Sequence, residues 1–148
     1  MIEIEKQRLV IADGQLKQQV IELLQQNDLP VSDIDDGKIL FALIRGGKIV
    51  GTAGLEVFDG CALVRSVSVE KASRGQGFGK FISQEIERIS KEQVVACLYL
   101  LTTTAKDFFS KEGYQVITRE EVPFAIRNTS EFLHVCPSSA TVMKKDLS

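Results

Sequence analysis

Cysteine is scarce in this chain, and no two cysteines stand close together. The 148 residues contain only Cys61, Cys97 and Cys136, and no pair of them has C-x-x-C spacing. An odd number of dispersed cysteines argues against a disulfide framework and against a zinc site. This usage is typical of a protein kept in a reducing compartment. We therefore expect a cytoplasmic protein with no bound metal.

Long apolar runs and an excess of positive charge are also missing. No apolar run approaches the roughly 20 residues that a membrane-spanning helix needs. The first residues, Met1 to Lys6, lack the apolar stretch of a signal peptide. A net charge of −2 and a pI of about 5.5 provide no basic surface for nucleic acid. We expect neither a membrane nor a nucleic acid as partner.

Internal repeats and low-complexity linkers are absent as well. A chain of 148 residues that is 44% hydrophobic is large enough to bury one core. We therefore expect residues 1–148 to form a single domain.

The spacing of the apolar residues alternates between the period of strands and that of helices. Gly46-Gly47 joins two apolar runs and indicates a β-hairpin, and Gly113 suits the left-handed position after a short helix. The expected strands cover residues 3–11, 39–44, 48–57, 62–69, 97–103, 114–118 and 140–143. The expected helices cover residues 13–27, 81–89 and 105–112. This order predicts an α/β fold with a mixed sheet.

A glycine-rich loop separates the strand at 62–69 from the helix that follows. Its sequence is Arg74-Gly75-Gln76-Gly77-Phe78-Gly79-Lys80. Glycines let a ligand approach the backbone closely, and a helix N-terminus favours negative charge. The loop therefore predicts a pyrophosphate site, with a turn that binds no ligand as the alternative. Its spacing is neither the dinucleotide pattern G-x-G-x-x-G nor the P-loop pattern G-x-x-x-x-G-K-[ST].

The pattern Arg74-x-x-Gly77-x-Gly79 resembles the acyl-CoA pyrophosphate loop, Q/R-x-x-G-x-G/A, of the GNAT superfamily of N-acetyltransferases. The order of expected elements is similar to that family over essentially the whole chain. The resemblance implies the GNAT fold, with a mostly antiparallel sheet, helices on both faces and a splayed central strand pair. It also implies acetyl-CoA as co-substrate. The cofactor-binding residues that it implies are Val67, Ser68, Val69, Arg74, Gly75, Gln76, Gly77, Phe78, Gly79 and Lys80.

Two further stretches resemble narrower groups of acetyltransferases. The segment Tyr99 to Ala105, with Phe108-Phe109 and Gly113-Tyr114, is similar to amino-acid N-acetyltransferases. The tail, residues 122–129 and 136–140, is similar to the acetyltransferases encoded in arsenic-resistance operons. These likenesses imply a small, amino-acid-like amine as acceptor and a link to arsenic resistance.

Acetyl transfer to an amine requires the acceptor to lose a proton. Glu56 is the candidate base, because it ends a strand beside the expected acceptor cleft; the alternative is a solvated carboxylate. His134, the only histidine, is a second candidate, with an exposed loop histidine as its alternative. The family's usual acid is a tyrosine, and Phe109 stands at that position. Either the thiolate leaves without an acid or another group replaces the tyrosine.

Two arginines are candidate acceptor-binding residues. Arg65 interrupts an apolar strand and must find an anion, which is either an acceptor carboxylate or a structural glutamate. Arg127 is a second candidate clamp, with an exposed loop arginine as its alternative. Together they would suit an acceptor with more than one acidic group. Thr102, Thr103 and Thr104 end a strand where the thioester is expected. Their hydroxyls could bind substrate, but capping the next helix is the simpler role, especially for Thr104.

The sequence therefore predicts an N-acetyltransferase that moves an acetyl group from acetyl-CoA to a small amine by direct attack in a ternary complex. The alternative is a protein of the same fold that binds acetyl-CoA or a metalloid as a sensor, without catalysis. Phe109, at the position of the usual tyrosine acid, is the residue that favours this alternative. A homodimer, which is common in the family, is also compatible with the sequence.

Overall fold

The computed structural model describes residues 7–29, 31, 38–129, 132–133 and 139–147. His134 and Cys136 lie outside the described residues. The strands are β1 (Arg8–Ile11), β2 (Ile39–Arg45), β3 (Lys48–Val57), β4 (Cys61–Val69), β5 (Cys97–Thr102), β6 (Gln115–Ile117) and β7 (Thr141–Asp146). The helices are α1 (Gly14–Gln26), α2 (Phe78–Glu92), α3 (Lys106–Lys111) and α4 (Phe124–Arg127), with short 3-10 helices η1 (Lys71–Ser73) and η2 (Arg119–Glu121). The order of strands and helices predicted from the sequence is confirmed.

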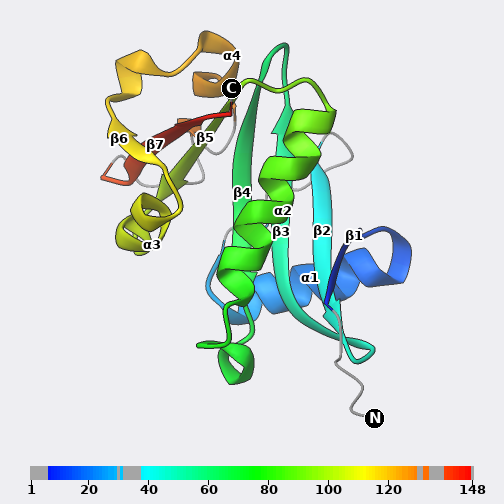
Figure 1. Cartoon of the computed structure of the whole chain (residues 1–148). Coiled ribbons are helices and arrows are strands. Elements are labelled where there is room, and N and C mark those ends of the chain that lie inside the picture. Colours follow the sequence, from blue (N-terminus) through cyan, green and yellow to red (C-terminus); the bar gives the residue numbers. More distant parts are fainter. Residues whose placement is uncertain (1–6, 30, 32–37, 130–131, 134–138, 148) are drawn as a thin grey trace.

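The strands form a single mixed sheet. In the described part of the chain, seven strands lie in the order β1-β2-β3-β4-β5-β7-β6, where β4 and β5 run parallel and the other neighbours antiparallel. Helices α1 and α2 lie on opposite faces of this sheet (Figure 1). The α/β fold with a mostly antiparallel sheet and helices on both faces is therefore as predicted. No helix in the described part of the chain is both long enough and apolar enough to cross a bilayer.

Helix α1 packs one apolar side against the sheet. Val20 and Leu24 are fully buried and form a cluster with Leu40 of β2. The helix ends in a Schellman motif: the Leu29 N–H donates to Leu24 O over 2.9 Å, and the Asp28 N–H donates to Gln25 O over 3.1 Å. Asp28 takes the left-handed conformation, with φ 59°, that the motif requires. This turn brings the end of α1 towards β4.

Helix α2 begins at Phe78, three residues before the start predicted from the sequence. Gly77 is its N-cap, with φ 82°. Phe78, Ile82 and Ile86 are buried and pack on the sheet face opposite to α1. Phe78 was expected in the glycine loop, because its neighbours are glycines; in the fold its ring is part of the core.

Helix α3 also packs on this second face. It ends at Lys111, and after it Gly113 has φ 98° and the Tyr114 N–H donates to Phe109 O over 3.0 Å. The left-handed glycine after this helix is therefore confirmed. The rings of Phe109 and Tyr114 pack edge to face, with centroids 5.5 Å apart.

The segment between β6 and β7 contains two short helices that were not predicted from the sequence. Helix η2 carries a capping box, in which the Thr118 N–H donates to the Glu121 carboxylate over 2.7 Å. Val122 and Ile126 are buried in a cluster with Leu63 of β4. Helix α4 has only four residues, too few to produce a helical period in the sequence.

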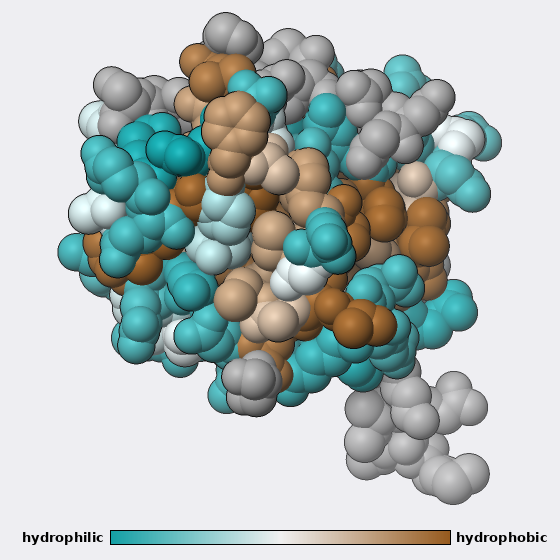
Figure 2. Space-filling model, turned by 90° about the horizontal axis from the view of Figure 1, so that it is seen from above, coloured by the Kyte–Doolittle hydropathy of each residue, from teal (hydrophilic) through white to brown (hydrophobic). Residues whose placement is uncertain are grey.

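Some apolar side chains remain at the surface. In the view from above, hydrophobic atoms (brown) reach the surface among hydrophilic ones (teal) (Figure 2). The most exposed large apolar residues of the described chain are Val94 (84%), Phe124 (72%) and Ile11 (62%). These three come from separate elements or loops of the fold.

Candidate active site

Strands β4 and β5 form a fork. They pair only at their beginnings, through Cys61 with Cys97, Ala62 with Leu98 and Leu63 with Tyr99. Further along, the two strands diverge towards the N-terminal end of α2 (Figure 1). The splayed strand pair that the sequence predicted is therefore present. Within it, the β4 backbone beyond Leu63 has no ladder partner on β5.

A cavity of about 430 Å³ lies in this fork. Its described lining consists of Asn27, Leu29, Val67, Ser68, Val69, Arg74, Gly79, Thr104, Ala105, Phe108 and Phe109. Asn27 and Leu29 come from the end of α1, on one face of the sheet. Phe108 and Phe109 pack with the α2 cluster on the other face. The cavity thus passes through the gap in the sheet, where an elongated ligand can be contacted from both sides.

A β-bulge shapes the β4 side of the cavity. Thr52 pairs with Ser68 but Gly54 pairs with Arg65, so β4 has one extra residue there. Ser66 has φ 57°, and the buried Thr52 hydroxyl donates to Ser66 O over 2.7 Å. Because Thr52 and Gly54 share a face, Arg65 and Ser68 also share a face, although they are three residues apart.

The glycine loop begins at the rim of the cavity. Gly75 and Gly77 have φ of 84° and 82°, a conformation that other residues rarely adopt. Arg74 lies on the loop surface, and its Nε donates to Val69 O over 3.0 Å. Gln76 and Lys80 are exposed. The loop therefore presents backbone at the N-terminus of α2.

Two other loop residues are turned towards the protein. A Cβ on Gly79 would lie 3.2 Å from the Phe108 ring, so the lack of a side chain keeps this edge of the cavity open. The ring of Phe78 is buried, and the Arg45 guanidinium lies over it, 5.3 Å from its centroid. Phe78 therefore offers only its backbone to the loop.

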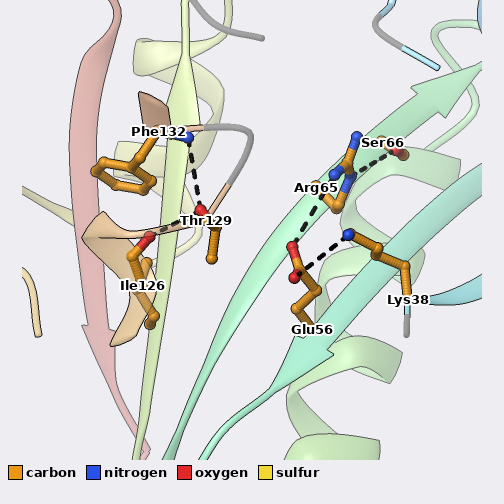
Figure 3. A network of polar contacts seen from close by, with 7 residues as sticks. All are labelled: Lys38, Glu56, Arg65, Ser66, Ile126, Thr129 and Phe132. Carbon is orange, nitrogen blue, oxygen red and sulfur yellow. Dashed lines mark hydrogen bonds and ion pairs between the residues drawn. The ribbon is translucent and has the colours of Figure 1, made fainter. Parts of the chain in front are cut away.

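A charged cluster lies near the point where β4 and β5 separate, because Glu56 pairs with Leu63, the last β4 residue that pairs with β5. The side chain of Arg65 is 1% exposed, and its Nη1 lies 4.0 Å from Oε2 of Glu56. The other oxygen of Glu56 lies 3.8 Å from Nζ of Lys38. In Figure 3 the Arg65 and Lys38 side chains point towards Glu56 from two sides. Two of the predicted site residues, Glu56 and Arg65, are thus brought together.

Gly54 makes room for this cluster. It stands opposite Arg65 in the β3–β4 ladder, and a Cβ there would lie 3.1 Å from Cγ of Arg65. The cluster lies on the α1 face of the sheet, between the apolar residues under α1 and those under α4. The sequence could not reveal this pairing, because Glu56 and Arg65 belong to different strands.

The family of the chain follows from its sequence. Residues 36–116, more than half of the chain, match the family described as the acetyltransferase (GNAT) domain. The chain belongs to the GNAT acetyltransferases.

Solved structures show the same GNAT fold. The N-acetylglutamate synthase of Neisseria gonorrhoeae, complexed with coenzyme A and N-acetyl-glutamate, has a TM-score of 0.82 and 15% identity, covering 99% of this chain. This chain spans only 36% of the length of that synthase. Rv2747 of Mycobacterium tuberculosis, in complex with CoA, has a TM-score of 0.79 and 17% identity, covering 95% of this chain and 99% of its own. A GNAT-family acetyltransferase of Staphylococcus aureus has a TM-score of 0.76 and 21% identity. The match covers 97% of this chain and 100% of the S. aureus chain.

In this GNAT protein the position of the expected tyrosine acid is apolar. Phe109 lines the cavity and is 7% exposed. Tyr114 is buried beneath it, and burial raises its pKa, with a smaller contribution from the charge of Glu87. A tyrosine that holds its proton so firmly, outside the cavity lining, is a poor proton donor to a bound substrate.

Of the three threonines near the end of β5, Thr102 and not Thr104 makes the contact at the start of the next helix. The Ala105 N–H donates to Thr102 Oγ1 over 2.9 Å, so Thr102, not Thr104, holds the start of α3. Thr104 instead lines the cavity. The expectation for Thr104 was wrong, because Ala105 rather than Thr104 is the N-cap of α3.

The remaining predicted site residue, Arg127, lies at the exposed end of α4. The preceding residue, Ile126, packs in the Leu63 cluster, on the same face as Arg65. Thr129 holds the following turn by donating to Ile126 O over 2.7 Å (Figure 3). Arg127 therefore shares a face with Arg65 but belongs to a separate layer above the sheet.

Sequence reasoning missed the contribution of α1. Asn27 lines the cavity, and its Nδ2 donates to Oγ of Ser68. The motif that ends α1 contains Asp28, where glycine is the usual residue. The glycine that usually marks such a turn in a sequence is therefore absent.

Proposed function

We propose that the protein transfers an acetyl group from acetyl-CoA to the amine of a small, amino-acid-like acceptor, by direct attack in a ternary complex. The observation that carries this proposal is the buried Arg65–Glu56 pair near the point where β4 and β5 separate, in the sheet that holds the cavity. The pair supplies a cation for an acceptor carboxylate and a carboxylate for the amine proton, close to the fork.

The residues present fit acyl-CoA. The β4 backbone at Val67–Val69 has no ladder partner on the β5 side and there offers groups to an amide-bearing chain. The loop at Arg74–Lys80 offers N–H groups at a helix N-terminus for a pyrophosphate. Acetyl-CoA supplies an activated acyl group in the form of its thioester. The sheet keeps the fork open, and Phe108 and Phe109 exclude water on the α2 face.

Glu56 is proposed as the base. The amine nitrogen attacks the thioester carbonyl carbon, the carbon–sulfur bond breaks with its electron pair on sulfur, and Glu56 takes the proton that the nitrogen loses. Arg65 is proposed to bind the acceptor carboxylate through its fork of N–H donors. A carboxylate there would share the guanidinium with Glu56, whose charge Lys38 continues to balance.

Arg127 is proposed to bind a second acidic group of the acceptor. It is exposed on α4, the element that covers the same face of the sheet as Arg65. The resemblance of the tail to arsenic-operon acetyltransferases supports a glutamate-like acceptor, including one that carries arsenic in the side chain. The support for this acceptor is a likeness of sequence, whereas the support for the role of Arg65 comes from the geometry of the structure.

The test is to follow CoA release from acetyl-CoA against a panel of free amino acids. The panel includes glutamate, neutral amino acids, and glutamate analogues with arsenic or phosphorus in the side chain. We expect turnover that depends on the acceptor and is fastest with dicarboxylic or similarly acidic amino acids. Turnover confined to acceptors without a carboxylate would refute the role of Arg65. No turnover with tight acetyl-CoA binding would favour an acceptor of another class.

A further inference from the structure

The cavity has few side chains that can donate a hydrogen bond. Of its described lining residues, only Asn27, Ser68, Arg74 and Thr104 carry side-chain N–H or O–H groups. Phe108 and Phe109 occupy the α2 side and carry none. The departing sulfur of the co-substrate gains negative charge as the carbon–sulfur bond breaks, so a donor near it lowers the barrier.

Ser68 is the most enclosed of these four donors. It lies 7% exposed on β4, between Val67 and Val69, in an otherwise apolar stretch of the strand. The bulge turns its side chain to the face shared with Arg65, which is the proposed acceptor side. Val67 and Val69 pack instead against the α2 cluster. Ser68 therefore presents a hydroxyl where the fork separates the two faces of the sheet.

Asn27 fixes the direction of this hydroxyl. Its Nδ2 donates to Oγ of Ser68, which uses a lone pair of the hydroxyl oxygen. An N–H group accepts no hydrogen bond, so the Ser68 hydrogen must point elsewhere. Asn27 is itself held by the Schellman motif at the end of α1, where its N–H donates to Leu23 O over 3.1 Å.

We propose that the Ser68 hydroxyl, oriented by Asn27, donates a hydrogen bond to the sulfur of the coenzyme and stabilises the thiolate as it leaves. This inference rests on the proposed acyl-CoA-dependent activity but not on the identity of the acceptor. A serine hydroxyl is too weak an acid to protonate a thiolate, whose conjugate thiol has a pKa near 8.5. The electron pair of the broken bond stays on sulfur, and the thiolate later takes its proton from water.

The other donors are less suited to this role. Thr104 lies exposed in the turn after β5, where water competes for its hydroxyl. Arg74 is exposed at the rim, and its Nε already donates to Val69 O. Ser68 with Asn27 therefore takes the place that a tyrosine at position 109 would have filled, from the opposite face of the sheet.

The experiment compares the binding of CoA with that of desulfo-CoA, which lacks the sulfur, by calorimetry between about pH 7 and pH 10. In the wild type we expect CoA to gain affinity over desulfo-CoA as its thiol ionises. In Ser68→Ala this gain should fall by about tenfold, the size of one hydrogen bond to a charged group. The affinity for desulfo-CoA should stay unchanged, which shows that the rest of the site is intact.

Three variants sharpen the result. Asn27→Ala should show part of the loss, and Ser68→Thr, which keeps a hydroxyl, should show little. Ser90→Ala removes another buried hydroxyl, near the far end of α2, and should leave both affinities unchanged. The loss of turnover in Ser68→Ala should appear in kcat more than in the KM for acetyl-CoA.

Several outcomes would overturn the proposal. Equal changes for CoA and desulfo-CoA in Ser68→Ala would make Ser68 a packing residue. A loss in Thr104→Val with none in Ser68→Ala would assign the donor to Thr104. A wild type that binds neither compound would instead refute the acyl-CoA site itself, which separates the two failures.

Discussion

The guanidinium of Arg65 and the carboxylate of Glu56 lie 4.0 Å apart, on neighbouring strands and largely hidden from solvent. Such a pair contributes little net stability, but removing one partner leaves the other as an uncompensated buried charge. Each residue is therefore both a structural counter-ion of the other and a proposed participant in the reaction. For variants of either residue, the melting temperature and the activity must therefore both be measured.

Glu56→Gln tests the proposed base. We expect kcat to fall by roughly 10²–10⁴-fold, the usual contribution of a positioned base. Binding of acetyl-CoA, measured by calorimetry, should be unchanged. Glu92→Gln, at an exposed ion pair with Arg88, is the matched control and should keep full activity. A pH–rate profile of Glu56→Gln that equals the wild-type profile would remove Glu56 from the mechanism.

Arg65→Ala tests acceptor recognition. Loss of a buried charge contact of about 2–5 kcal/mol should raise the KM for the acceptor at least roughly 30-fold, with a small change for acetyl-CoA. Because Arg65 is buried, the melting temperature should fall as well. Arg127→Ala, on the surface of α4, should raise the acceptor KM less and leave stability unchanged. An equal rise in both KM values for Arg65→Ala would point to a general distortion of the fork.

Gly79→Ala tests the rim of the cavity. The added Cβ would lie 3.2 Å from Cε1 and Cζ of Phe108, so the ring has to move into the cavity. We expect CoA affinity to fall by about tenfold, a loss of ~1.4 kcal/mol, while helix stability stays equal or improves. The double variant Gly79→Ala/Phe108→Leu should recover part of the affinity. Wild-type affinity in Gly79→Ala would contradict the assignment of this edge to the coenzyme.

Val94→Gly tests strain after α2. Val94 closes a Schellman motif with φ 60°, and its side chain is 84% exposed, so little packing is lost with it. Removing a β-branched side chain from this conformation should stabilise the protein by about 1 kcal/mol, or roughly 2–4 °C in Tm. The same change at Val116, exposed in strand β6, should destabilise it. A drop in Tm for Val94→Gly would contradict this account.

Tyr114→Phe tests the alkaline limit of stability. Burial raises the pKa of Tyr114 above its usual value near 10, so its favourable contribution is complete below pH 10 and declines above it. The free energy of unfolding of the wild type should therefore fall above pH 10, by up to ~1.4 kcal/mol per pH unit for this group. Denaturant titrations of Tyr114→Phe should show a shallower decline, because Tyr99, whose pKa burial also raises, remains. Identical slopes would exclude Tyr114 as the cause.

Much of the fold could be predicted, because its signals are local. Apolar periodicity and the turns at Gly46-Gly47 and Gly113 determine the order of the elements, and β2 and β3 do form the predicted hairpin. The glycine loop was recognisable because residues other than glycine rarely adopt φ angles such as those at Gly75 and Gly77. These features need no knowledge of distant contacts.

The parts of the site that could not be predicted depend on contacts across the sequence. The Asn27–Ser68 hydrogen bond joins residues 41 positions apart, and the Arg65–Glu56 pair depends on the register of two strands. Neither has a periodicity or a motif. Helix α4 was missed for the opposite reason, since a four-residue helix is too short to leave a pattern.

The fork also gives this sheet an edge in its interior. β4 and β5 are central in strand order, yet beyond their three paired residues each faces the gap as an edge strand faces solvent. Such backbone groups recognise any extended chain of amides by its main-chain spacing, with little dependence on side-chain identity. Selection at these positions would then act on side-chain size and backbone shape, so distant relatives can differ at most residues here and still retain the same gap.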